Sequence, residues 1–252
     1  RQDLRALRRL AASGLAIVAL AIFVQGARAD DGKIITSHGI STFGDLKYGP
    51  DFVPDYVNVN APKGGEMSQW AFGSFDSMNP YSGKGRAHLF SVFAFESLLG
   101  DAISGDGLPA DKYGEAYCLL CETVEYPAGK SWVKFTMRPE ARFSDGMPLT
   151  AHDIAFSHNL LLDEGLKSYA DAVRKRIPKV EVIDDHTIKF YFADGISRRS
   201  LIEQVGGVPA WPKHWFEENG IGLQDSWLES PPGSGPYMVG DFNLTRRIVL
   251  ER

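Results

Sequence analysis

The segment of residues 132–162 constrains the fold most strongly, since it reads as a strand, a turn and a helix in succession. Along residues 132–137, Val133, Phe135 and Met137 alternate with bulky or polar neighbours, which is the period of a strand with two unlike faces. The proline two residues after Met137 cannot donate a hydrogen bond to a sheet, so the strand should end before it.

The turn and the start of the helix have their own signals. Ser144, Asp145 and Gly146 combine short side chains that bond the backbone with a glycine that can take positive φ. Thr150 and Asp153 have the spacing of a capping box, in which each side chain accepts the other residue's backbone N–H. The pattern therefore predicts a helix that begins just after Thr150.

The first 29 residues have the features of a secretory signal peptide. Arginines precede an apolar stretch over residues 10–24, and Ala27-Arg28-Ala29 is a small-x-small cleavage site. The apolar stretch is short for a membrane span, which needs about 20 residues. Arg8-Arg9 raises the twin-arginine route, but the rest of that pattern is poor, so we expect general secretion.

Composition is that of an ordinary globular protein, with 44% hydrophobic and 23% charged residues in 252. The net charge is −5, and removing residues 1–29, which carry +4, leaves −9. This acidic balance argues against binding to nucleic acid or to an anionic membrane surface.

The chain has two cysteines, Cys118 and Cys121, separated by two leucines. A redox CxxC motif normally opens a helix in a thioredoxin-like unit, which is absent around it. A zinc site needs two more ligands, and no nearby Cys or His supplies them. A local disulfide, or two buried thiols, in an oxidising compartment fits better.

The rest of the chain divides into short elements. Residues 30–65 predict an extended arm, residues 66–72 a first strand, and residues 89–99 a helix that stops at Gly100. Two hairpins are expected next: one pairs 122–126 with 132–137, and the other pairs the strands on either side of 184–186. Residues 171–176 are expected to be a charged surface stretch.

Two short helices are expected over residues 199–205 and 212–219. A last hairpin joins 238–242 to 248–251.

The sequence gives no positive sign of catalysis. It contains no nucleophile elbow, HExxH motif, P-loop or full GxGxxG motif. His152 and His158 are six positions apart and fall on different helix faces, so they cannot chelate one metal from that helix alone. Asp184 and Asp185 lie in a hairpin turn, where acids are usually solvated. We therefore expect no enzyme activity, cofactor or metal site in this part.

Residues 135–153, FTMRPEARFSDGMPLTAHD, resemble the hallmark of the family 5 extracellular solute-binding proteins, the receptors of ABC importers for peptides, dipeptides and nickel. Segments similar to other landmarks of that family follow in the family's order, at residues 180–190, 209–215 and 233–237. The arm resembles the subgroup that imports oligopeptides and peptide antibiotics.

The resemblance implies an α/β, periplasmic-binding-protein-like fold of type II, in the peptide-binding cluster. Residues 30–99 and 184–252 would form lobe I, and residues 100–183 an inserted domain II. The second ligand lobe, which in the family usually holds the acid for the peptide's amine, would be missing, so the sequence would be an N-terminal fragment.

The implied function is that of a monomeric substrate-binding subunit. It would capture peptides or modified peptides in the periplasm and deliver them to an ABC permease. A secreted hydrolase with its catalytic residues in the absent C-terminal part is the alternative, and a redox or assembly protein acting through the two cysteines is a third.

The order of landmarks places Lys84, Gly85 and Arg86 where relatives contact the ligand backbone. Glycine permits close approach, and either cation could pair with a ligand carboxylate or phosphate; the competing interpretation is a solvated basic loop. Four further candidates for ligand binding are Asn79, Tyr81, Gly206 and Trp211.

Overall fold

The computed structural model describes residues 32–70, 72–87, 94–101, 113–244 and 246–252. The expected signal peptide, residues 1–29, lies outside the described residues, as do residues 89–93 of the helix expected at 89–99. Within the described ranges no helix has the length and apolar character needed to cross a membrane.

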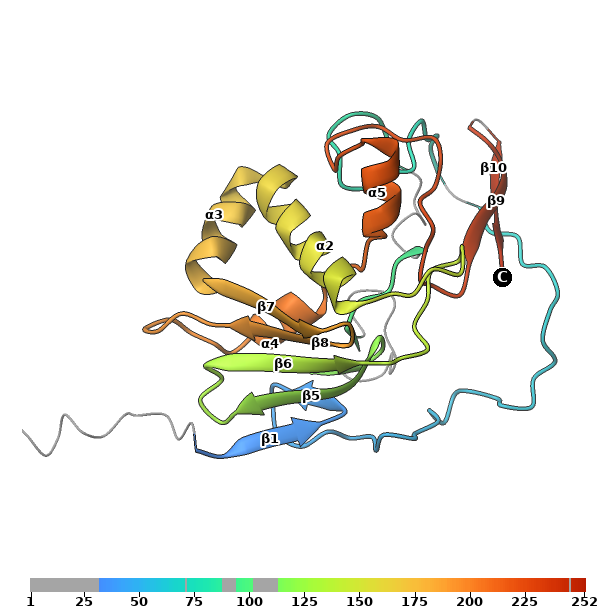
Figure 1. Cartoon of the computed structure of the whole chain (residues 1–252). Coiled ribbons are helices and arrows are strands. Elements are labelled where there is room, and N and C mark those ends of the chain that lie inside the picture. The colour runs from blue at the N-terminus through green and yellow to red at the C-terminus, as the bar shows by residue number, and fades with distance from the viewer. Residues whose placement is uncertain (1–31, 71, 88–93, 102–112, 245) are drawn as a thin grey trace, which may run out of the picture.

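A five-stranded antiparallel sheet forms the centre of the fold (Figure 1). Its strand order is β1-β5-β6-β8-β7. The strands are β1 (Ile34–Ser37), β5 (Cys121–Pro127), β6 (Trp132–Met137), β7 (Lys179–Asp184) and β8 (Thr187–Tyr191). Both hairpins predicted from alternation, β5–β6 and β7–β8, are therefore confirmed.

One face of this sheet makes the main core. Phe135 of β6 pairs with Val124 of β5 and with Ile188 of β8, and none of these three side chains is exposed to solvent. The register therefore aligns the apolar residues of three strands on the same side. The polar residues of the same strands face away from this core.

Helices α2 (Ala151–Glu164) and α3 (Lys167–Arg176) lie over this core, and α2 packs against β7 and β8 (Figure 1). The predicted start of α2 is confirmed. Asp153 accepts a hydrogen bond from the backbone N–H of Thr150 at 2.9 Å, the reverse half of the capping box. The stretch expected to be charged and on the surface, residues 171–176, is exposed except for Val173, and it forms the last part of α3.

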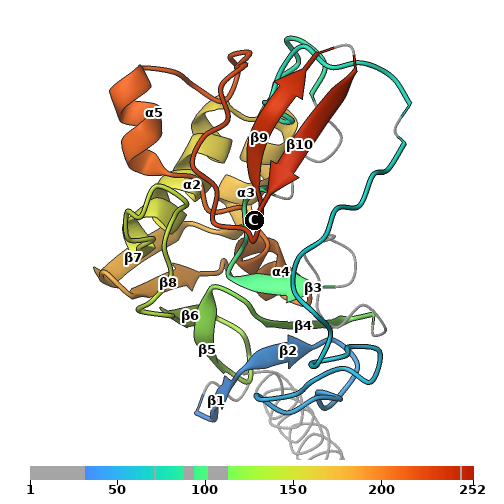
Figure 2. The ribbon, with the colours of Figure 1, turned by 90° about the vertical axis from the view of Figure 1, so that its right-hand side faces the viewer.

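A second, three-stranded sheet has the order β2-β4-β3 and consists of β2 (Gly39–Ser41), β3 (Leu99–Asp101) and β4 (Glu115–Cys118). The predicted helix end at Gly100 was wrong. Leu99 and Gly100 pair with Cys118 and Tyr117, so their backbone groups enter a sheet that local sequence does not reveal. Figure 2 shows β3 next to helix α4 (Leu201–Gly206).

The arm expected at residues 30–65 contributes β1 and β2 and then runs outside the body of the fold (Figure 1). The first strand expected at residues 66–72 was wrong. Met67, Trp70 and Phe72 are 80%, 85% and 92% exposed, and the described part of 66–72 has no strand partner. A strand needs a neighbour to satisfy its backbone groups, and alternation alone does not supply one.

The C-terminal elements follow the predictions. α4 is followed by α5 (Lys213–Asn219), which ends at Gly220 in the left-handed conformation (φ 60°), and by the hairpin of β9 (Met238–Asn243) and β10 (Arg247–Glu251). A second core beneath α5 is mainly aromatic. It contains Ala94, Phe95, Leu160, Trp211, Phe216, Leu223 and Trp227.

The expected domain limits do not coincide with the sheets. The five-stranded sheet takes β1 from residues 30–99, β5 and β6 from residues 100–183, and β8 from residues 184–252. The limit at residue 184 falls within the β7–β8 hairpin.

Candidate functional site

The loop of residues 76–87 closes on itself. It contains five of the predicted ligand-binding residues, namely Asn79, Tyr81, Lys84, Gly85 and Arg86. The backbone N–H of Asp76 donates to the carbonyl oxygen of Arg86 at 3.0 Å, and the carboxylate of Asp76 accepts the N–H of Arg86. Gly85 has φ +86°, and a Cβ there would lie 2.9 Å from Asp76 Oδ1 and 3.1 Å from Ser77 Cβ. Glycine is therefore required at this position for both conformation and space.

This loop is anchored on the segment of residues 222–227. The side-chain nitrogen of Asn79 donates to the carbonyl oxygens of Leu223 and Asp225, at 2.7 and 2.6 Å. Ser82 Oγ donates to the carbonyl oxygen of Gln224 at 2.8 Å. Asn79 is only 1% exposed, so its amide holds the loop in place from within.

The two cations of the loop differ in their partners. Lys84 Nζ lies 3.4 Å from Asp225 Oδ1, and both side chains are largely exposed. The backbone N–H of Gly222 and then Lys84 hold the pKa of Asp225 below its usual range. Arg86 donates to Ser74 Oγ at 3.2 Å and has no carboxylate partner among the described residues. Its guanidinium is therefore the better candidate for an anionic ligand group.

Tyr81 and Trp211 meet at the base of the loop. Their ring centroids are 4.8 Å apart in an edge-on arrangement, and Tyr81 is half-buried while Trp211 is fully buried. Trp211 Nε1 has no hydrogen-bond partner in the described part of the chain. In this structure Trp211 supports the loop from the core rather than offering surface to a ligand.

Gly206 lies elsewhere, in α4. A Cβ at this position would come within 2.5 Å of Leu99 Cδ1. The missing side chain therefore lets α4 pack closely on β3, and the structure does not bring Gly206 to the 76–87 loop.

Helix α2 positions the segments that carry this site. The hydroxyl of Ser157 accepts the backbone N–H of Trp211 at 2.8 Å, and the carboxylate of Asp153 accepts that of Lys213 at 3.2 Å. Glu164 accepts the N–H of Leu223 at 2.7 Å. Ser157 and Glu164 have no local signal in the sequence that predicts this role, since their partners lie more than 50 positions away.

Three of the resembling segments meet in space. Ser144, in the turn before α2, donates its N–H to the carbonyl oxygen of Gly233 at 2.8 Å. Asp145 lies 2.7 Å from His214 Nε2. Burial of Asp145 acts to raise its pKa, but hydrogen bonds from the N–H of Met147 and from His214 outweigh it and lower the pKa overall. These landmarks therefore act as scaffold around the site.

Cys118 and Cys121 form a disulfide in the structure, with the two sulfur atoms 2.07 Å apart. The bond spans the end of β4 and the start of β5, so it lies at the junction of the two sheets. Among the described residues no group of His, Cys, Asp or Glu has the geometry of a metal site.

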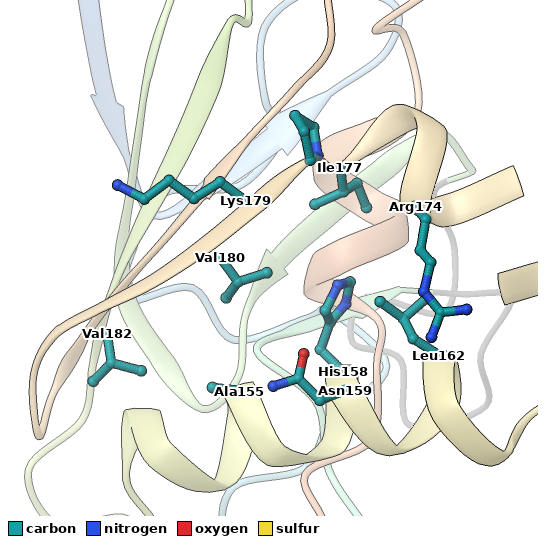
Figure 3. Close-up of a pocket in the computed structure, with 10 residues that line it drawn as sticks. Ala155, His158, Asn159, Leu162, Arg174, Ile177, Lys179, Val180 and Val182 are labelled. Carbon is teal, nitrogen blue, oxygen red and sulfur yellow. The ribbon is translucent and has the colours of Figure 1, made fainter. Parts of the chain in front are cut away.

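A pocket of about 400 Å³ lies between α2, α3 and β7 (Figure 3). Its walls contain Ala155, His158, Asn159, Leu162, Arg174, Ile177, Pro178, Lys179, Val180 and Val182. His158 is 3% exposed, and burial lowers its pKa to about 4, so its ring is neutral at neutral pH.

The fold defines the chain as a mixed α/β protein of the type II periplasmic peptide-binding class. It is similar to the mannohexaose-bound periplasmic oligopeptide-binding protein of an ABC transporter from Thermotoga maritima. The TM-score is 0.55 at 27% identity, over 72% of this chain and 32% of that one. The oligopeptide-binding protein AppA of Bacillus subtilis, solved with a nonapeptide, shares the fold with a TM-score of 0.53 at 18% identity, over 71% of this chain and 34% of that one.

The chain belongs to the bacterial extracellular solute-binding proteins of family 5, whose model matches residues 116–252. It is 32% identical to the probable peptide-binding protein YejA of Agrobacterium fabrum over 254 residues, which cover 98% of this chain and 39% of that protein. It is also 32% identical to the peptidoglycan-binding protein YepA of the same organism, over 85% of this chain and 35% of that protein. The chain thus spans about two fifths of the length of these relatives.

Proposed function

We propose that the protein is a substrate-binding subunit of an ABC importer, exported to the periplasm, which captures peptides or modified peptides and delivers them to a membrane permease. The family match over residues 116–252 carries this proposal. The relatives include a probable peptide-binding protein and a peptidoglycan-binding protein, which favours a ligand with a peptide backbone.

The proposal also assigns a role to each part of the protein. The described residues would supply lobe I and the inserted domain, and the second ligand lobe would lie in the part of the relatives that this chain does not span. A ligand would be enclosed by closure of the two lobes, which excludes water and needs no chemical step. The protein would act as a monomer.

On the side present here, the 76–87 loop would face the ligand. Arg86 would pair with a carboxylate or phosphate, and Gly85 would let the ligand backbone approach closely. The rigid attachment of this loop to residues 222–227 through Asn79 supports the proposal, because a preorganised loop loses little entropy on binding.

The test requires the full-length protein. It should be purified without refolding from the periplasm of the cells that produce it, and its bound ligand should be identified by native mass spectrometry. Arg86→Ala should then weaken binding of that ligand about tenfold by calorimetry, as expected for loss of a charge-assisted hydrogen bond. Arg246→Ala, an exposed arginine in the β9–β10 turn, is the matched control and should bind as the wild type does.

Two results would count against the proposal. Unchanged affinity of Arg86→Ala would remove the 76–87 loop from the site while leaving the family function intact. Conversion of the co-purified ligand into products by the full-length protein would favour the hydrolase alternative over a binding subunit.

A further inference from the structure

The pocket between α2, α3 and β7 has the dimensions of a binding site. At about 400 Å³ it falls within the range of protein pockets that hold a ligand. Figure 3 shows Val180 and Val182 of β7 pointing toward α2, where Ala155 and His158 lie. None of its lining residues belongs to the 76–87 loop or to the segment that anchors this loop.

Helix α3 places positive charge beside this pocket. It carries four basic residues and one acidic residue within 10 positions, in a chain whose net charge is −5. Arg174, which lines the pocket, is paired with Asp163 at 2.8 Å. Lys175 and Arg176 are exposed and have no carboxylate partner among the described residues. The basic end of α3 therefore offers uncompensated charge next to a pocket with a mixed polar and apolar lining.

One polar group of the pocket lacks a partner. His158 Nε2 is buried and makes no hydrogen bond within the described part of the chain, although the ring contacts Phe190 edge-on at 5.5 Å between centroids. A buried polar atom without a partner costs about 1–3 kcal/mol. An apolar side chain in the pocket gives this atom no partner, so only a polar group of the bound segment, such as a backbone N–H or carbonyl group, would offset this cost.

The shape of the surface distinguishes between possible occupants. A helix that binds a membrane inserts protruding apolar side chains into the lipid. Here Leu162, Ile177 and Val180 line a hollow, which instead receives a protruding side chain. Among the residues that the structure describes, the charge of α3 without a carboxylate partner is confined to Lys175 and Arg176 at its end, because Lys167 at its start is paired with Asp171 at 3.3 Å. A single small anion would neutralise only one of these two cations.

We propose that the pocket and the basic end of α3 form a docking site for an acidic, extended segment of a partner protein. One large apolar side chain of that segment fills the pocket, and flanking carboxylates pair with Lys175 and Arg176. This site is separate from the ligand site of the proposed function and does not depend on it.

The probe is a fluorescein-labelled seven-residue peptide with a central leucine and three acidic residues on each side, blocked at both ends. Fluorescence anisotropy at low salt should show saturable binding with a Kd below about 1 mM. Replacing the central leucine by glycine should weaken binding at least about tenfold, since the pocket then no longer buries the leucine side chain. A lysine-rich peptide with the same central leucine should not bind.

The protein variants locate the site. Lys175→Glu with Arg176→Glu should weaken binding at least tenfold, while Lys33→Glu with Lys63→Glu, which makes the same charge change at exposed positions of the arm, should change it less than twofold. Ala155→Leu narrows the pocket and should also weaken binding. Val182→Phe narrows the pocket from β7 and should weaken binding as well. It provides a second test if Ala155→Leu proves unstable.

Three outcomes would overturn the proposal. The first is no binding up to millimolar peptide. The second is binding that the α3 and pocket variants leave unchanged, which would put the peptide elsewhere. The third is binding of phosphatidylglycerol vesicles that depends on Lys175 and Arg176 while the peptide shows no dependence on its leucine, which would indicate a membrane surface.

Discussion

The side-chain nitrogen of Asn79 lies 2.7 Å from the carbonyl oxygen of Leu223, although the two residues are 144 positions apart in the chain. This contact ties the candidate ligand loop to the segment that follows α5. It also explains why an asparagine is needed there, because one amide NH₂ can donate to two carbonyl oxygens at once.

Asn79→Ala should therefore destabilise the protein by about 1–3 kcal/mol, because two buried carbonyl oxygens lose their donor. Urea unfolding followed by tryptophan fluorescence would measure this. Asn58→Ala, at an exposed position of the arm, is the control and should change the free energy of unfolding by less than about 0.5 kcal/mol. Equal effects of the two variants would contradict the anchoring role of Asn79.

Gly85→Ala should strain the 76–87 loop, since an L-residue at φ +86° is disfavoured and its Cβ would meet Asp76 and Ser77. We expect a loss of about 1–2 kcal/mol in the free energy of unfolding, together with weaker ligand binding by the full-length protein. Gly83→Ala is the matched control in the same loop, because a Cβ there meets nothing within 4 Å. If Gly83→Ala lost as much free energy of unfolding as Gly85→Ala, the loop would tolerate no added side chain at either position, and the special role of Gly85 would be contradicted.

His158 should make stability depend on pH below neutrality. Its pKa is about 4 in the folded protein, against about 6.5 when exposed, because burial disfavours the charged ring. Between these values the unfolded chain binds more protons than the folded one, so acidification favours unfolding; above pH 7 both forms are neutral and the effect vanishes.

The shift amounts to about 3 kcal/mol of stability lost between pH 8 and pH 4. In His158→Leu the difference in unfolding free energy between pH 7 and pH 4.5 should be smaller by about 2–3 kcal/mol than in the wild type. His152→Gln, at a side chain that is 58% exposed, should leave that difference as it is. An unaltered pH profile in His158→Leu would mean that the ring is solvated in solution.

The disulfide between Cys118 and Cys121 encloses a very short loop, with a sequence separation of 3. Closing so few residues removes little entropy from the unfolded chain, so we expect only about 2 kcal/mol from the bond. The double variant Cys118→Ala/Cys121→Ala should unfold at lower urea than the oxidised wild type and should be insensitive to reductant. If reductant leaves the wild type unchanged, the bond does not stabilise the junction of the sheets.

Local patterns in the sequence were sufficient for many elements. The alternation around Phe135 predicted β6, the Thr150 and Asp153 pair predicted the start of α2, and the helix expected over residues 212–219 ends at Asn219 as α5 does. Each of these signals acts within a few residues, through side-chain periodicity, capping or a left-handed glycine. Each can therefore be recognised without knowing the rest of the chain.

The candidate site was predictable only in part. Lys84, Gly85 and Arg86 were found as one loop, and the structure adds the reason for the glycine. Asn79 was expected to face a ligand, whereas the structure gives it buried partners 144 and 146 positions away. Such partners leave no periodic trace, so sequence reasoning could name the residue but not its role.

The sequence by itself determined which residues of β5 to β8 alternate, where α2 begins and α5 ends, and the order of the family landmarks, because these depend on neighbours in the chain. Only the tertiary structure decided that residues 99–101 pair as a strand, that residues 66–70 pair with no strand in the described part of the chain, and that α2 holds the segments around Trp211 and Leu223. The physical reason is that backbone pairing and buried hydrogen bonds require a partner in space, and the fold alone brings that partner near.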